Sequence, residues 1–321
     1  MRALKWMSIG LLVLLTVAVG WYLTRPGMAD VGIPYANTPA AETRGVTVKW
    51  FGIATLLIDD GQTQIMTDGF FSRPGLLDIL LRRPIAPELS AITGVIADHK
   101  INRLAAVIPV HSHYDHAMDS AEVAMQTGAL LLGSNSTAHI ARSSSLPESQ
   151  IRIVETDRGY QFGRFTVTFY ASRHAPLSTN AGIDGVVEKP FALPAPYTAW
   201  QLGEAYSILI EHPDGDMLVQ GSAGYVPGAL NGVTVNAVFL GTGGLRALPR
   251  DYQQAYIDEI VVSTKASDVY SIHHDNLFGQ LGEVEQSKLL LEFDKMFAFE
   301  LGQLVLPAKL LQLHYAQAVG L

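Results

Sequence analysis

The sequence predicts a mixed α/β fold in which β-sheets are covered by helices. Short apolar or alternating runs, typical of strands, recur between residues 46 and 272, and glycine, proline and aspartate separate many of them. Segments with helical periodicity lie between or after these runs. Polar residues follow several of the predicted strands, and in α/β folds ligands bind at strand ends.

The predicted elements of the first half are strands at 46–51, 54–59 and 64–67, loops and short helices at 71–103, a strand at 104–110, a helix at 118–126 and a strand at 129–133. The turn at Asp60-Gly61 separates the second strand from the third, and Gly128 closes the helix. The second half predicts strands at 165–170, 205–211, 216–220, 235–240 and 269–272, then a helical pattern from residue 284. A Pro-Asp-Gly-Asp turn makes the strands at 205–211 and 216–220 a hairpin.

The composition limits the class of protein. The chain has 321 residues, of which 48% are hydrophobic, which is enough for one large domain with a substantial core. A formal net charge of −8 argues against sequence-independent binding of nucleic acid, which requires a basic surface. The absence of cysteine excludes disulfides, thiolate metal ligands and a cysteine nucleophile.

Residues 1–24 have the pattern of a targeting element. Arg2 and Lys5 precede a largely apolar run that extends from Trp6 to Leu23. The run predicts a single transmembrane helix or a cleaved signal sequence, and an aromatic pair at its far end favours the uncleaved anchor. Both interpretations place the rest of the chain outside the cytoplasm, membrane-anchored or secreted, and on the periplasmic side of the inner membrane in a bacterium.

Two further regions follow this element. Residues 25–45 are rich in proline, glycine and small side chains without any period, and they predict a linker. The strand-like runs begin at Val46, so that residues 46–321 predict one folded domain.

The most informative segment is His-Ser-His-Tyr-Asp-His at residues 111–116, directly after the apolar run 104–110. It places imidazoles and a carboxylate, the side chains that bind zinc and similar divalent ions, on neighbouring positions. Burying such groups at a strand end is costly unless they have partners. The segment therefore predicts a metal site, and a metal-dependent hydrolase is the first hypothesis.

With these features the chain resembles the metallo-β-lactamase-fold hydrolases. It is most similar to the branch that contains L-ascorbate-6-phosphate lactonase and the phospholipase D that hydrolyses N-acylphosphatidylethanolamine. The resemblance covers roughly residues 46–280 and rests on Trp50-Phe51-Gly52, Thr67-Asp68, the motif at 111–116, His174, and the segments 221–225 and 272–276. It implies an αββα metallo-β-lactamase sandwich for the domain at 46–321.

The resemblance implies two metal positions. The first would be held by His111, His113 and His174, and the second by Asp115, His116 and His273. One or two divalent ions are expected. Zinc is the first choice because the first group is all imidazole, while manganese and iron(II) stay open. A metal-bound hydroxide would attack the substrate, and Asp115 and His116 are the predicted catalytic residues.

Three further residues are expected to support these ligands. Asp68 is predicted to orient a ligand histidine by a hydrogen bond, and Asp275 either supports His273 or forms a turn. Ser222 stands where most of the family has a carboxylate that bridges both metals. Since a hydroxyl is the poorer ligand, the resemblance implies a weaker second site, a bridge made by hydroxide alone, or a loss of activity.

The resulting hypothesis is a metal-dependent hydrolase of an ester, lactone, amide or phosphoester at an extracytoplasmic site. A β-lactam hydrolase and a catalytically impaired binding protein are the alternatives, both motivated by Ser222. The apolar segments 70–90 and 175–204 predict a lid over a small-molecule or lipid-like substrate, or ordinary packing. The expected partners are that substrate and, through the N-terminal segment, a membrane. No nucleic acid is expected, and the sequence leaves the oligomeric state open.

Overall fold

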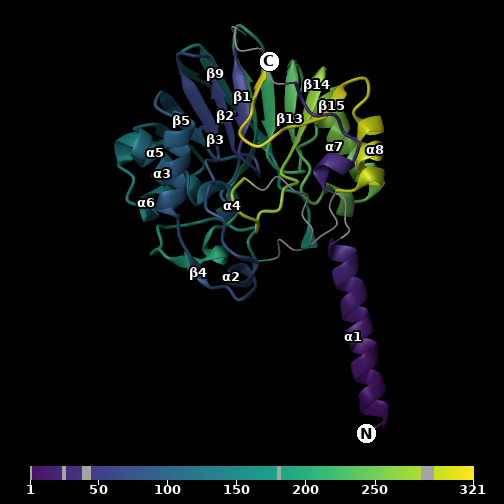
Figure 1. Cartoon of the computed structure of the whole chain (residues 1–321). Coiled ribbons are helices and arrows are strands. Elements are labelled where there is room, and N and C mark those ends of the chain that lie inside the picture. The colour runs from purple at the N-terminus through teal and green to yellow at the C-terminus, as the bar shows by residue number, and fades with distance from the viewer. Residues whose placement is uncertain (1, 24–26, 38–44, 179–181, 283–292) are drawn as a thin grey trace.

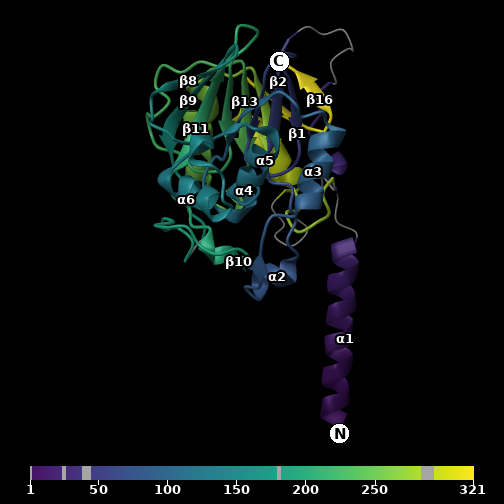
Figure 2. The ribbon, with the colours of Figure 1, turned by 90° about the vertical axis from the view of Figure 1, so that its left-hand side faces the viewer.

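The computed structural model describes residues 2–23, 27–37, 45–178, 182–282 and 293–321. Two seven-stranded sheets pack face to face, and helices cover the outer face of each (Figures 1 and 2). The αββα sandwich implied by the resemblance is therefore confirmed. The core between the sheets is apolar, with Trp50, Phe169 and Phe239 fully buried in it.

The first sheet combines the N-terminal meander with a parallel half. Its strands are, in spatial order, β16 (Ala318–Gly320), β1 (Thr47–Trp50), β2 (Leu56–Asp59), β3 (Gln64–Thr67), β5 (Leu104–Ile108), β6 (Leu130–Gly133) and β7 (Ile151–Ile153). Helices α3 (Leu89–Asp98), α5 (Ser120–Thr127) and α6 (Asn135–Ser143) cover its outer face. Because β3, β5, β6 and β7 are parallel, their carboxyl ends lie at one edge.

The second sheet contains the predicted hairpin and a parallel half. Its strands are, in spatial order, β15 (Lys309–Gln312), β14 (Asp268–Ile272), β13 (Ala237–Gly241), β12 (Met217–Gln220), β11 (Ala205–Glu211), β9 (Phe165–Ser172) and β8 (Gly159–Phe162). Its outer face is covered by α7 (Arg250–Ile257), the π-helix Asp258–Val262 and α8 (Lys295–Leu304). Strands β12 to β15 are parallel, and β9 runs in the same direction.

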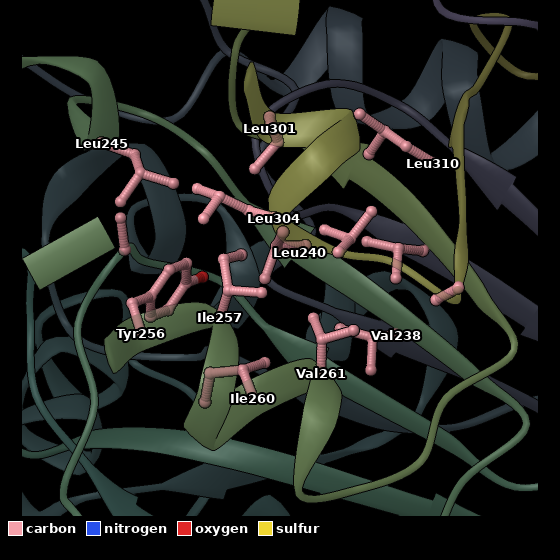
Figure 3. Close-up of a cluster of buried hydrophobic side chains, with 14 of the residues drawn as sticks. Val238, Leu240, Leu245, Tyr256, Ile257, Ile260, Val261, Leu301, Leu304 and Leu310 are labelled. Atoms are coloured by element: carbon pink, nitrogen blue, oxygen red, sulfur yellow. The ribbon is translucent and has the colours of Figure 1, made fainter. Parts of the chain in front are cut away.

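Strand β13 shows how the side chains of one strand alternate between the core and the helix-covered face of the sheet. Phe239 faces the core between the sheets, whereas Val238 and Leu240 face the outer helices (Figure 3). This alternation follows from the two-residue period of a strand, and it requires apolar residues on both faces because both are covered. The outer helices supply side chains such as Ile257 and Leu301 to the same cluster (Figure 3).

Replacing Leu240 with alanine is expected to lower the free energy of unfolding by about 2–5 kcal/mol, because a fully buried side chain leaves a cavity. Denaturant titration followed by circular dichroism measures the change. Leu306, which is 56% exposed, is the matched control, and Leu306→Ala is expected to cost less than about 0.5 kcal/mol. Equal losses in both variants would contradict this assignment of the core.

The two segments predicted to wall the site lie together. Strand β4 (Pro84–Ile85) pairs with β10 (Ala195–Pro196), and α2 (Leu76–Leu80) precedes β4. The two segments share a separate apolar cluster, in which Ile85 and Trp200 are buried together with Tyr114 of the predicted metal motif. Apolar side chains of both segments are thus buried beside the metal motif.

The N-terminal helix differs from the expectation. Helix α1 (Arg2–Leu23) extends away from the domain in both views (Figures 1 and 2). Within the described part of the chain, no helix reaches the length and apolarity that crossing a membrane demands. The described residues therefore do not support the transmembrane helix predicted at residues 1–24.

The predicted linker and the C-terminal segment both contribute to the folded domain. In the predicted linker, Met28, Val31 and Ile33 are buried against the second sheet, while residues 38–44 lie outside the described part. The helical pattern predicted from residue 284 appears as α8, with residues 283–292 outside the described part. The helical expectation is wrong for β15 and β16, which complete the outer edges of the two sheets.

Candidate metal centre

The predicted ligands leave their strands at the edge where the carboxyl ends meet. The metal motif follows β5 and turns into the one-turn helix α4 (Tyr114–Ala117). His174 comes two residues after β9, and His273 comes directly after β14. Three separate segments are therefore brought to one place by the arrangement of strands on both sheets.

The first ligand group consists of His111, His113 and His174, whose ring nitrogens lie within 4.8 Å of one another. Nε2 of His111 is 3.1 Å from Nδ1 of His113. Nε2 of His113 lies 3.2 Å from the Ile183 carbonyl, and Nδ1 of His174 lies 3.0 Å from the Ala175 carbonyl. Because a carbonyl only accepts, these nitrogens carry the protons, and the other nitrogen of each ring is left for a metal.

The second ligand group consists of Asp115, His116 and His273. Nε2 of His273 is 3.2 Å from Nε2 of His116 and 3.6 Å from Oδ2 of Asp115. The same carboxylate oxygen is 3.7 Å from Nε2 of His116. Ligands at ordinary zinc–nitrogen distances in a tetrahedron lie about 3.3 Å apart, so this triangle fits a metal ion.

The two groups are adjacent. The ring centroids of His111 and His116, one from each group, are 4.0 Å apart. Such neighbouring groups have the arrangement that a two-metal site requires. The ligand roles of these six residues remain predictions, for which the convergence of the side chains provides the geometry.

Asp68 lies directly behind the second group. It is fully buried and follows β3, with a positive φ of 53°. Oδ2 is 2.7 Å from Nδ1 of His116, and Oδ1 accepts a hydrogen bond from the Val110 backbone at 2.9 Å. One carboxylate therefore orients the His116 ring and ties it to the strand end that carries the motif.

The protonation of these groups suits metal binding. Burial, followed by repulsion from neighbouring imidazoles, lowers the pKa of His111 well below its usual value and that of His174 to about 3. Neutral imidazoles have a free lone pair at neutral pH. Burial opposes ionisation of Asp115, but His116 and His273 outweigh it and lower the pKa of Asp115. The first group is therefore neutral and the second carries a carboxylate.

His116 has the opposite shift. Burial alone lowers the pKa of this imidazole, but the carboxylates of Asp68 and Asp115 outweigh burial and raise it. A divalent cation held by Asp115, His116 and His273 would replace the proton on Nε2 of His116, while the hydrogen bond from Nδ1 to Asp68 would remain.

Ser222 lies beside the first group and is used in a structural contact. Its Oγ accepts a hydrogen bond from the backbone of Ala175 at 3.0 Å, so it supports the loop that carries His174. Among the described residues, no carboxylate belongs to both ligand groups. A centre whose two positions are not bridged by a protein side chain therefore remains a prediction.

Replacing Ser222 with aspartate is expected to raise the affinity for the second ion, roughly tenfold, because a carboxylate is a stronger ligand for a divalent cation than a hydroxyl. Competition with a chromophoric chelator measures the affinity. Ser222→Ala is the matched control, since it removes the contact to Ala175 without adding a charge. If the aspartate variant binds the second ion no more tightly than the alanine variant, Ser222 does not correspond to the bridging carboxylate that the resemblance implies.

His274 and Asp275, which follow the ligand His273, have separate roles. His274 is turned away from the ligand groups, with Nδ1 3.2 Å from the Ser271 hydroxyl and its ring against Trp50. Asp275 does not contact the His273 ring directly. It accepts a hydrogen bond from Ile53 at 2.8 Å and lies 3.4 Å from Arg73. The choice of His273 over His274 therefore agrees with the geometry.

Two contributors to the site were not predicted from the sequence. The Ile183 carbonyl orients His113, and Arg73 lies behind Asp275. A backbone carbonyl has no signature in a sequence. Arg73 does have a sequence signature, because it is a charged residue directly after the largely apolar stretch that follows Asp68.

A cavity of about 640 Å³ opens beside His174. Its wall combines charged residues with apolar ones; among them are Arg173, Asp184, Glu204, Leu177, Leu202 and Tyr206. A volume of this order accommodates a small molecule. The ligand groups therefore have a neighbouring space in which a substrate can lie.

Comparison with known proteins agrees with this description. No family model matches the sequence. A curated UPF0173 metal-dependent hydrolase from Heliobacterium modesticaldum is 29% identical over 121 residues. The match covers 38% of this chain and 43% of the relative, so the chain spans less than half the length of that protein.

Solved structures show the same architecture at low sequence identity. A possible metal-dependent hydrolase from Veillonella parvula superposes with a TM-score of 0.55 at 13% identity, over 87% of this chain and 100% of that chain. A diiron β-hydroxylase from Streptomyces venezuelae superposes with a TM-score of 0.52 at 14% identity, over 87% of this chain and 55% of that chain. This chain therefore shares the fold of these solved structures.

Proposed function

We propose that this chain is a metal-dependent hydrolase that cleaves an ester, lactone, amide or phosphoester of a small molecule. The observation that carries the proposal is the pair of adjacent ligand groups at the carboxyl ends of the strands. The curated relative that shares part of the sequence is named a metal-dependent hydrolase, which supports the same reaction class. The sandwich itself supports only the fold, because one fold hosts many activities.

Divalent ions held by the two groups would supply an activated water at neutral pH and a Lewis acid for the substrate oxygen. Asp115 has a lowered pKa and lies among His116 and His273, so it is positioned both to bind a cation and to accept a proton. Asp68 keeps His116 in the tautomer that leaves Nε2 free.

Zinc is the proposed metal because the first group contains imidazoles alone. Iron(II) is the main competitor, since a structural neighbour of the same fold is a diiron enzyme. Imidazole and carboxylate bind both metals, and their affinity order does not decide occupancy in a cell.

The substrate class proposed here follows the resemblance to the lactonase and phospholipase branch. The cavity beside His174 has charged and apolar walls, which suits a substrate with a polar reacting group and an apolar part. The segments 70–90 and 182–204 pack next to the metal motif through Tyr114. A lactone or a phosphoester with an acyl chain is therefore the first compound to test.

The test is a hydrolysis screen on the purified full-length chain with aryl esters, lactones, amides and phosphodiesters. We expect turnover of at least one class, loss of turnover with a chelator and recovery with zinc or iron(II). Protein that binds metal but hydrolyses nothing on the panel would contradict the hydrolase and favour the binding-protein alternative.

A β-lactam hydrolase is the second candidate. It is favoured by the lack of a carboxylate common to both ligand groups among the described residues. Nitrocefin turnover distinguishes it from the first proposal. Rapid hydrolysis of nitrocefin together with inactivity towards esters and phosphodiesters would make it the better account.

We also propose contact of this domain with a lipid surface. Leu77, Leu80 and Leu81 are 62%, 66% and 60% exposed, and Arg82 and Arg83 follow them. Exposed apolar groups beside cations suit the interface of an anionic membrane. Helix α2 lies on the side from which α1 extends (Figures 1 and 2). An extracytoplasmic location remains a prediction from the sequence.

Vesicle flotation tests this contact. We expect the full chain to float with vesicles that contain phosphatidylglycerol, and Leu77→Asn with Leu80→Asn to weaken binding several-fold, because about 25 cal/mol is lost per Å² of apolar surface no longer buried. Leu306→Asn is the matched control, because Leu306 is 56% exposed and lies outside α2. Flotation that the double variant leaves unchanged would remove α2 from the proposed contact.

A further inference from the structure

Arg73 lies behind the second ligand group and takes no part in the hydrolysis proposed above. Its side chain is 9% exposed and belongs to the segment between β3 and α2. Nη2 lies 3.4 Å from Oδ2 of Asp275 and donates to the Phe51 carbonyl at 3.2 Å. The guanidinium also lies against Phe70, 5.3 Å from the ring centroid.

An arginine is costly at this position. Its Nε and Nη1 are buried, and neither has a hydrogen-bond partner in the described part of the chain. Unpaired N–H groups of a buried cation carry a desolvation penalty. An apolar side chain would fill the same space without that penalty. The charge of Arg73 therefore has a use, and the carboxylate in contact with it is that of Asp275.

Asp275 connects Arg73 to the backbone of His273. Oδ1 of Asp275 accepts a hydrogen bond from the Ile53 backbone at 2.8 Å, and the Ile53 carbonyl accepts one from the His273 backbone at 2.9 Å. Ile53 and His273 both have positive φ, 48° and 57°. This conformation is unfavourable for side chains other than glycine, so surrounding contacts must hold it.

Gly52 provides the space for this arrangement. Its φ is +94°, and a Cβ at this position would clash with Nη2 of Arg73 and Oδ2 of Asp275. Only a glycine lets the guanidinium and the carboxylate meet beside the turn. The contact between Arg73 and Asp275 thus depends on the glycine at position 52.

We infer that Arg73 is a positioning residue for the second metal, acting through Asp275 and Ile53 on the backbone of His273. The backbone conformation held in this way directs Nε2 of His273 to within 3.2 Å of His116 Nε2 and 3.6 Å of Asp115 Oδ2. The inference rests on the proposed function, because His273 needs this direction only as a ligand.

The test compares Arg73→Met and Arg73→Lys with the natural chain by zinc titration against a chromophoric chelator and by the visible spectrum after cobalt(II) loading. We expect the methionine variant to keep the first ion and to bind the second roughly 10–100-fold more weakly. Lysine is expected to recover part of the affinity, because it restores the charge beside Asp275 without the planar donor set.

Arg103→Met is the matched control. It removes another arginine–aspartate contact, one that is more exposed and in which Nη2 lies 2.8 Å from Oδ2 of Asp59 on β2, and it is expected to leave both ions in place. Thermal unfolding of the metal-free variants separates a lost ligand position from a lost fold. If Arg73→Met does not fold, Asp275→Asn takes its place, since it removes the charge while keeping the shape.

A folded Arg73→Met variant, or Asp275→Asn in its place, that binds two ions with natural affinity and an unchanged cobalt spectrum would overturn the inference alone. A natural chain that takes up no metal would overturn the proposed function and the inference together. Selective loss of the second ion in the Arg73 variants, with Arg103→Met unaffected, would support both.

Discussion

Replacing His113 with alanine is expected to reduce turnover of the identified substrate to the background of the assay and to lower the metal content by about one ion per chain. His113 lies 3.1 Å from His111 within the first group, and its other nitrogen is fixed by the Ile183 carbonyl. Without it, two imidazoles remain to hold the first ion. Steady-state kinetics and elemental analysis of the same preparation measure both effects.

The control for this variant is His139→Ala. His139 lies on α6, where its ring contacts Arg142 at 3.4 Å, and it belongs to neither ligand group. Activity and metal content of this variant should match the natural chain. A His113 variant with unchanged turnover would contradict the ligand assignment.

Replacing Asp68 with asparagine is expected to lower metal affinity or activity 10–100-fold, roughly the effect of removing a group that orients a metal ligand. The amide keeps an acceptor for Val110, but it presents an N–H to Nδ1 of His116. The ring then adopts the tautomer with a proton on Nε2, the atom that faces the second position. Titration with zinc measures the loss.

Asp60→Asn is the matched control for Asp68→Asn. Asp60 also meets a buried histidine, with its Oδ2 3.4 Å from Nε2 of His212. The two aspartates lie at opposite ends of β3, so that Asp60 is remote from the ligand groups. Equal losses of metal affinity in both variants would mean that any disturbed Asp–His pair has this effect, and would contradict a specific role for Asp68.

The motif at 111–116 was predictable because its chemistry is local. Imidazoles and a carboxylate on neighbouring positions after a buried strand already define most of both ligand groups. The alternating pattern of β9 and the hairpin of β11 and β12 were predictable for the same reason, since their period and turn are written in consecutive residues.

Other features depend on contacts between distant segments. Strand β16 pairs with β1 from the opposite end of the chain, and β4 pairs with β10 across more than one hundred residues. Neither short strand has a period of its own that a local pattern would reveal. The pairing of Arg73 with Asp275 is likewise a tertiary contact, which only the folded chain brings together.

The N-terminal expectation had a different weakness. A run of apolar residues after Arg2 and Lys5 predicted a membrane span, but the described part of the chain contains no helix that fulfils the requirements for one. The described residues therefore give this expectation no support.

Metal content is the measurement that tests the central claim most directly. The full-length chain is purified without added metal or chelator, and its bound ions are counted by elemental analysis. The two adjacent ligand groups predict about two divalent ions per chain. Metal-free protein that takes up neither zinc, manganese nor iron(II) on titration would contradict the account.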